Sequence, residues 1–526
     1  MDAVDTDVVV VGAGGAGLLA ALAARQAGAD VLLLGKAPAG RGTCTAMAAG
    51  IFSAPSQGFS EDAHLEATLE AGRGLNDRAR VEQLVERARP ALEALRRAGA
   101  PLEAAGNGYR IPAGDRPTVP GIRLAQWLRR RVREAGVREA PLRAIDLVVA
   151  EGEAAGVTGV SPDDRTVFVR AGAVVLASGG GAALYPRHDN PPGIAGDGLA
   201  LALRAGCALR DMEFVQFYPV GFAEPGLPTF LVYPPYPPGT RLWDARGRNA
   251  LEDLPGCRDL NDAIIRFRDH SALRFQRAHE EGGLFLDFTA VAPELWGTHW
   301  CLRRLARSAF DFRRRRFRVA PLAHFTIGGV EVDRDAATSV PGLFAAGEVT
   351  GGLHGANRLG GNALTECAVC GPIAGERAAA RARERGRPAA AGSQVLRLLP
   401  ADPGPGVRPE YGELRRAARR VAGDHAGIVR DGEGIRRGLG RLDALWGELT
   451  RLPPRGTRDV RAHADATSAL LVLRCILEAG RRRQESRGAF FRSDHPETDE
   501  ERWRVSQRVR LDGADRLAVE TVGERR

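Results

Sequence analysis

Three glycines near the N-terminus are spaced for binding a phosphate. Gly12, Gly14 and Gly17 form a G-x-G-x-x-G sequence directly after the β-branched run 7–11. In such a turn the first glycine allows a tight bend, the second lets the backbone approach a pyrophosphate, and the third lets a helix pack against the strand. The N-terminus of that helix faces the anion. The spacing therefore predicts a dinucleotide site.

The residues after the second predicted strand bear on which dinucleotide binds. A carboxylate usually stands there and accepts hydrogen bonds from ribose hydroxyls, but this chain has Gly35 and Lys36. The difference argues against a classical NAD site. A flavin dinucleotide held by further contacts stays open.

Cys367 and Cys370 form a C-x-x-C pair, a pattern that also occurs in redox and metal sites. No second cysteine pair accompanies them, so we expect a buried structural role and no metal site. The seven cysteines are few and scattered for a chain of 526 residues. Such a set is typical of a reducing compartment, and we expect a cytoplasmic location.

The elements that must position these residues follow from hydrophobic patterning. Apolar runs at 7–11 and 31–34 read as buried parallel strands, and the alanine-rich segment 18–28 between them reads as a helix. A further strand is expected within 166–178, and helix is expected over 61–100 and throughout the chain beyond residue 411. Proline and aromatic residues cluster within 219–260, where a second domain is expected.

Composition limits the class of protein. Apolar residues make up 44% of the chain, charged residues 26%, and the mean hydropathy is -0.21, as in soluble globular proteins. The net charge of +9 comes almost wholly from arginine, since Lys36 is the single lysine. The arginine runs at 129–131, 312–318 and 481–483 read as solvated faces. We therefore expect no nucleic-acid partner and no direct insertion into a membrane.

Several long segments then resemble one known family. They are 320–329 (APLAHFTIGG), 339–348 (SVPGLFAAGE) and 354–364 (HGANRLGGNAL), with shorter matches at 196–198, 211–217 and 485–488. Together they resemble the flavoprotein family of succinate dehydrogenase, fumarate reductase and L-aspartate oxidase, over about residues 6–505. The chain length is nearer to L-aspartate oxidase and the shorter fumarate reductases.

The resemblance implies an α/β fold with three parts. A Rossmann-like FAD-binding domain is expected over 1–215 and 322–385, interrupted by an α+β capping domain over 216–321. A linker over 386–410 leads to a C-terminal helical domain over 411–526.

The resemblance also implies FAD as the cofactor. The glycine loop, carboxylates that accept hydrogen bonds from the hydroxyl groups of FAD, and backbone at the flavin edge are expected to hold it. The expected residues are Gly12, Gly14, Gly15, Gly17, Lys36, Gly42, Thr43, Ala49, Gly50, Asp197, Glu348, Ala363 and Leu364. Membrane-bound members tether FAD to a histidine just before 46–50. Here 42–45 reads Gly-Thr-Cys-Thr, so non-covalent FAD is predicted.

For catalysis, the resemblance implies that His324 and Arg358 bind a substrate carboxylate. The proton-transfer arginine of the family matches Arg268, in an Arg-Asp pair fourteen residues before Gly282. Arg258 and Arg266 remain alternatives. Glu252 matches an acid that feeds the relay.

Two departures concern the substrate. Tyr218 stands where the family has a carboxylate-binding histidine, and the proline-rich run 231–238, with Tyr233 and Pro234, replaces a polar pair. The capping side therefore offers hydroxyl groups and aromatic surface instead of charge, unless another arginine such as Arg241 enters. We expect a monocarboxylate with an apolar or aromatic far end to be a better substrate than fumarate, succinate or L-aspartate.

The predicted activity is hydride transfer between flavin N5 and a carbon adjacent to a carboxylate. One alternative is an amino-acid oxidase of the L-aspartate oxidase kind. Another is a flavin subunit without catalysis of its own in an electron-transfer complex. An iron-sulfur electron-transfer partner is possible in either setting.

Overall fold

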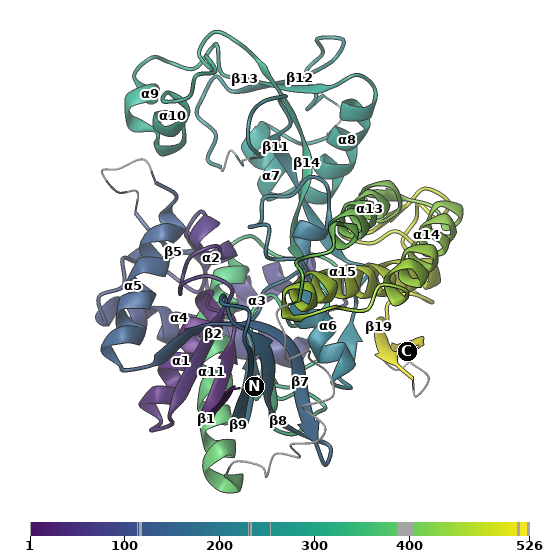
Figure 1. Ribbon diagram of the computed structural model, residues 1–526. Coiled ribbons are helices and arrows are strands. Elements are labelled where there is room, and N and C mark those ends of the chain that lie inside the picture. The colour runs from purple at the N-terminus through teal and green to yellow at the C-terminus, as the bar shows by residue number, and fades with distance from the viewer. Residues whose placement is uncertain are drawn as a thin grey trace.

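A central sheet organises the molecule. The computed structural model describes residues 2–112, 114, 118–229, 231, 234–252, 254–386, 404–512 and 516–522. The seven-stranded sheet has the order β6-β2-β1-β9-β8-β7, with β16 also paired to β9 (Figure 1). Its strands are β1 (Asp2–Val11), β2 (Val31–Gly35), β6 (Arg138–Pro141), β7 (Arg143–Ala150), β8 (Glu153–Val160), β9 (Thr166–Leu176) and β16 (Leu343–Ala345). The pairs from β6 to β9 and the β9–β16 pair are parallel, and β8 and β7 are antiparallel.

Two helices with small residues lie directly against each other beside this sheet. Helix α1 (Gly15–Gln26) joins β1 to β2 and packs along α11 (Asn362–Arg385). A side chain at Gly371 or Gly375 would come within 2.8 or 2.1 Å of a carbonyl oxygen of α1. Glycine at these positions therefore lets the two backbones touch, which holds the start of α11 near the start of α1.

The other elements of this part surround the sheet. They are α2 (Cys44–Met47), β3 (Ile51–Ser53), α3 (Glu61–Ala71), α4 (Arg78–Arg97), β4 (Glu103–Ala104), β5 (Gly108–Arg110), α5 (Pro120–Glu134), the short 3-10 helix at Ala182–Leu184, and α6 (Asp197–Arg204). The helix expected over 61–100 is two helices, because the segment 72–77 between them turns at Arg73 and Gly74 with positive φ.

A second, smaller sheet stands at the top of the view in Figure 1. Its order is β11-β14-β13-β12, from β11 (Val215–Phe222), β12 (Arg241–Asp244), β13 (Leu284–Asp287) and β14 (Phe317–Thr326). Helices α7 (Leu260–Ile265), α8 (Arg268–Glu280), α9 (Leu295–Thr298) and α10 (Trp300–Leu305) accompany it. Strands β11 and β14 lead out from the larger part and back into it, so their lower ends carry residues toward the glycine loop.

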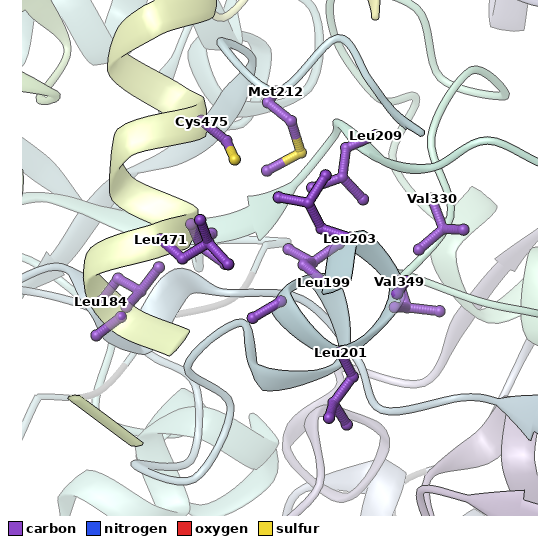
Figure 2. Packing of buried hydrophobic residues seen from close by; sticks show 14 of the residues in the cluster. Leu184, Leu199, Leu201, Leu203, Leu209, Met212, Val330, Val349, Leu471 and Cys475 are labelled. Atoms are coloured by element: carbon purple, nitrogen blue, oxygen red, sulfur yellow. The ribbon is translucent and has the colours of Figure 1, made fainter. Parts of the chain in front are cut away.

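The C-terminal segment begins with three helices, α13 (Pro409–His425), α14 (Gly432–Thr450) and α15 (Thr457–Arg482). Figure 2 shows Leu471 and Cys475 of α15 facing Leu199 and Leu203 of α6 across a buried apolar core. Because α6 begins at Asp197, this packing ties the C-terminal helices to one end of the predicted dinucleotide site.

The expectation of helix throughout the chain beyond residue 411 is wrong for its last part. Short strands β17 (Val429–Arg430) and β18 (Phe491–Arg492) pair, and β19 (Ser506–Leu511) and β20 (Leu517–Val522) form a hairpin. Strand β19 also pairs with β10 (Leu209–Arg210), which in turn pairs with β15 (Gly329–Val330). The pairing with β10 joins residues far apart in sequence, which leaves no local signal for it.

Two further predictions concern the linker and the membrane. Most of the expected linker, residues 387–403, lies outside the described residues. Within the described part of the chain, no helix is both long and apolar enough to cross a membrane.

Candidate active site

The glycine loop has the geometry that its sequence predicts. Gly12 has a φ of +117°, and a side chain there would meet the carbonyl oxygen of Ala177 at 2.1 Å. A side chain at Gly17 would lie 1.8 Å from the Gly12 carbonyl oxygen, whereas one at Gly14 would meet only ordinary contacts with Thr43 and Thr45. The first and third glycines are therefore required for packing, and the middle glycine borders open space.

That space is a cavity of about 760 Å³. Residues of the large sheet and of the smaller sheet β11-β14-β13-β12, here called the cap sheet, line it. All the expected cofactor residues except Gly17 line it, and so do Tyr218, Arg268, His324 and Arg358. The structure thus gathers into one cavity residues spread from position 12 to position 364.

At the dinucleotide end, Lys36 forms an ion pair with Asp197 and donates to the Gly193 carbonyl oxygen at 2.6 Å. Arg143 approaches the other oxygen of Asp197 at 3.7 Å and pairs with Asp465 of α15. The C-terminal helices thereby reach the acid expected to bind a ribose.

Glu348 lies in the middle of the cavity wall. Its Oε1 accepts the Thr326 N–H at 3.0 Å, and burial raises the pKa of the carboxyl to about 7. Ala363 and Leu364 lie in the first turn of α11, where backbone N–H groups have no carbonyl four residues earlier in the helix. The N-terminus of α1 can bind the phosphates of a flavin dinucleotide, and that of α11 can bind the edge of its ring. The carboxylates of Asp197 and Glu348 can accept hydrogen bonds from its hydroxyl groups.

Arg358 is buried at the other end of the cavity. Its guanidinium lies over the Phe325 ring, 4.4 Å from the centroid, and donates to Oε1 of Gln216 at 2.8 Å. Burial, and next the charge of Arg268, lower its pKa to about 9. Its Nε has no hydrogen-bond partner among the described residues, so this cation can still bind an anion.

Of the three arginines considered for proton transfer, one lines the cavity. Arg268 begins α8, its Nε donates to the Ile264 carbonyl oxygen at 3.1 Å, and burial lowers its pKa. The side chains of Arg258 and Arg266 are 78% and 59% exposed and both pair with Asp262. Geometry therefore favours Arg268.

Tyr218 has a second tyrosine beside it. The hydroxyl groups of Tyr218 and Tyr236 lie 3.4 Å apart, and burial raises the pKa of both well above its ordinary value. Both therefore stay uncharged at neutral pH. Tyr233 lies outside the described residues, and Arg241 is exposed and does not line the cavity.

Glu252 does not lie where the resemblance implied, next to the proton-transfer arginine. The structure places it on the exposed surface, outside the cavity wall. The segment after β12 turns outward there, with the Glu252 N–H donating to the Asn249 carbonyl oxygen at 3.2 Å. Nothing in this geometry lets Glu252 feed a proton to Arg268.

The cysteine pair lies on α11. Cys367 and Cys370 are free thiols on α11, and burial raises the pKa of each. Among the described residues no group of three or more histidine, cysteine and acidic side chains could hold a metal ion.

Sequence reasoning missed several residues that complete the site. Asp189 pairs with His324, and Asn357 links Gln216 to Asp269 through hydrogen bonds of 2.6 Å on each side. Asp189 belongs to a polar run, 187–190, in the connection that leads from the buried strand β9 through the 3-10 helix Ala182–Leu184 to α6. Polar residues beyond the carboxyl end of a sheet strand are the signal that could have found it.

Known proteins match this chain over nearly its whole length. The family model described as FAD binding domain matches residues 7–364, and the one described as fumarate reductase flavoprotein C-terminal region matches residues 415–523. An L-aspartate oxidase of Streptomyces coelicolor is 33% identical over 99% of this chain and 94% of its own length. A fumarate reductase (CoM/CoB) subunit of Methanothermobacter marburgensis is 30% identical, over 95% of this chain and 96% of its own.

A solved structure of the E. coli quinol fumarate reductase FrdA is also similar. It superposes with a TM-score of 0.87 at 26% identity, covering 99% of this chain and 97% of that one. The predicted family, α/β fold class and FAD cofactor are thereby confirmed. The chain is an FAD-dependent oxidoreductase and belongs to the flavoprotein family of fumarate reductase, succinate dehydrogenase and L-aspartate oxidase.

Proposed function

We propose that the chain transfers a hydride between non-covalently bound FAD and one carbon of the carbon–carbon bond next to the carboxylate of a monocarboxylic acid. The observation that carries the proposal is the make-up of the pocket wall. Arg358 and His324 line it as groups that can bind a carboxylate, while the cap contributes the uncharged Tyr218, backed by Tyr236, whose hydroxyl group lies 3.4 Å from that of Tyr218.

The residues would divide the work as follows. Arg358 binds the carboxylate with the free edge of its guanidinium, held in place by Gln216 and the Phe325 ring. Arg268, on the cap side of the cavity, delivers or removes the proton on the carbon next to the one that exchanges the hydride. FAD, when bound, supplies the hydride chemistry.

The far end of the substrate would meet Tyr218, Pro234 and Ile265, all of which line the cavity. Arg268 is the cation beside Tyr218, and pairing with a second carboxylate would take it from proton transfer. A second ionised carboxylate without that pairing would be a buried unpaired charge, which costs several kcal/mol. An alkyl or aryl group instead packs favourably against tyrosine and proline surfaces.

The test compares kcat/KM for fumarate with that for trans-cinnamate, using reduced flavin as the hydride source. Cinnamate should be preferred, and Tyr218→His should shift the preference toward fumarate by adding a cation. Tyr218→Phe is the matched control, because it keeps the aromatic ring and adds no charge. A fumarate preference of about tenfold, or roughly 1.4 kcal/mol, in the wild-type protein would contradict the proposal.

A second activity is favoured by the relatives named L-aspartate oxidase, which cover nearly the whole chain. It would be oxidation of an amino acid with electrons passing to oxygen. Hydrogen peroxide released with L-aspartate would support it, and its absence would favour the first activity.

An iron-sulfur protein is proposed as the electron-transfer partner. The support is that one relative is named as one subunit of a fumarate reductase, and that E. coli FrdA belongs to quinol fumarate reductase. The cytoplasmic location expected from the cysteine content stays a prediction, as do the domain boundaries.

A further inference from the structure

A buried carboxylate fixes the hydrogen on one ring atom of His324. Nδ1 of His324 lies 2.7 Å from Oδ2 of Asp189, whose side chain is 8% exposed. The other oxygen of Asp189 accepts from the side-chain amide of Asn190 at 3.0 Å, and the side-chain oxygen of Asn190 accepts from the Cys44 thiol at 3.1 Å. Asp189 is therefore an acceptor on both oxygens, and Nδ1 carries the hydrogen.

The opposite ring atom is the one that a ligand meets. His324 lines the cavity, and its Nε2 has no hydrogen-bond partner among the described residues. In a neutral imidazole with hydrogen on Nδ1, Nε2 presents a lone pair. A lone pair repels a carboxylate, whereas the imidazolium form presents an N–H that donates to it.

We propose that Asp189 couples substrate binding to proton uptake, so that a carboxylate entering the cavity binds His324 together with one proton at Nε2. The proton comes from solvent, joins the Nε2 lone pair, and is then donated to the carboxylate in a hydrogen bond. No bond to carbon changes in this step. Asp189 acts through His324 and is a positioning residue. The inference rests on the proposed function, since it requires a carboxylate ligand.

Other groups near His324 could also exchange protons. Those facing it are His188 on the same loop as Asp189, Tyr218 with its ring centroid 5.6 Å from that of His324, and Cys44, Arg268, Glu348 and Arg358 across the cavity. Burial raises the pKa of Tyr218 and Cys44 and lowers that of His188, so these three stay neutral. Glu348, with a pKa of about 7, and Arg358, with a pKa of about 9, are the competing sites of uptake.

Variants of Asp189 separate these sites. In Asp189→Asn the new amide can donate to Nδ1, so a neutral imidazole then carries its hydrogen on Nε2 and can donate to a carboxylate directly. This substitution also removes a charge that raises the pKa of Glu348 and of Arg358. Loss of proton uptake in both Asp189→Asn and His324→Gln would therefore assign the proton to His324.

The experiment is calorimetric titration of the FAD-loaded, oxidised protein with trans-cinnamate. Cinnamate cannot be reduced by oxidised flavin, so binding is measured without turnover. Titrations at mildly alkaline pH are repeated in buffers of different ionisation enthalpy. The dependence of the observed enthalpy on buffer gives the number of protons taken up.

We expect uptake near one proton in the wild-type protein and near zero in Asp189→Asn and His324→Gln. Asp335→Asn, an exposed acid paired with Arg377, is the matched control and should match the wild type. Unchanged uptake in Asp189→Asn, or no uptake in the wild type, would overturn the inference.

A second measurement does not depend on any Asp189 variant. In the ¹⁵N spectrum of histidine-labelled wild-type protein, with His324 identified by His324→Gln, neutral His324 should carry its hydrogen on Nδ1. Hydrogen on Nε2 would overturn the inference. If cinnamate fails to bind while fumarate binds, the proposed substrate class is wrong, and the same titrations with fumarate still decide the role of Asp189.

Discussion

Gln216 and Arg358 join the two parts of the molecule at the substrate end of the cavity. The Arg358 guanidinium donates to Oε1 of Gln216 at 2.8 Å, and Nε2 of Gln216 donates back to the Arg358 carbonyl oxygen at 3.0 Å. Gln216 lies on β11, the strand that leads into the cap, and Arg358 lies just before α11. The cation that we propose binds the carboxylate is thus oriented by the cap strand.

Gln216→Glu should weaken substrate binding. The change keeps the side-chain volume and the acceptor for Arg358 but adds a negative charge that competes with the substrate carboxylate. Hydrogen bonds to charged groups contribute about 1.5–3 kcal/mol, so KM should rise at least about tenfold with FAD content unchanged. Gln276→Glu, on the exposed face of α8, is the control. Equal KM values in the two variants would contradict the role of Gln216.

Arg268→Ala should abolish turnover and leave FAD bound. Loss of a positioned proton-transfer group costs about 10²–10⁴-fold in rate, measured here as kcat with the preferred enoate. Arg258→Ala and Arg266→Ala are matched controls, because both side chains point to solvent and share Asp262. If either control loses activity instead, the assignment of the relay is wrong.

FAD should be released by acid precipitation. Thr43 and Cys44 line the cavity where related proteins carry a tethering histidine, and burial raises the pKa of the Cys44 thiol, which keeps it a poor nucleophile. After trichloroacetic acid the yellow colour should appear in the supernatant. Colour that stays with the pellet would show a covalent bond.

The site residues that could be predicted from the sequence lie in contiguous, distinctive segments. Gly12, Glu348 and Arg358 lie in long stretches whose residue types and spacing are distinctive, so their place in one cavity could be inferred. The pairing of Asp189 with His324 could not be inferred, because the two residues are 135 positions apart. Tyr236 was likewise hidden in a proline-rich run without periodicity. The pairing of β19 with β10 joins residues about three hundred positions apart.

Glu348→Gln should stabilise the FAD-free protein at high pH and have little effect at low pH. Burial raises the pKa of this carboxyl from 4.5 to about 7 in the folded state. A group with a raised folded-state pKa favours folding below its unfolded pKa, and that contribution is lost as pH rises through the folded value. At 1.36 kcal/mol per pKa unit, the loss between about pH 4.5 and pH 8.5 is about 3 kcal/mol.

Glutamine removes this pH dependence because its amide oxygen still accepts from the Thr326 N–H and carries no charge. Urea unfolding of both FAD-free proteins across that pH range measures the difference in free energy of unfolding. The gap between the two curves should widen steadily from acid to alkaline pH, with the glutamine variant more stable at the alkaline end. Parallel curves would mean that Glu348 is already ionised in the folded protein at acid pH, and that water or a neighbouring cation such as Arg358 compensates its charge.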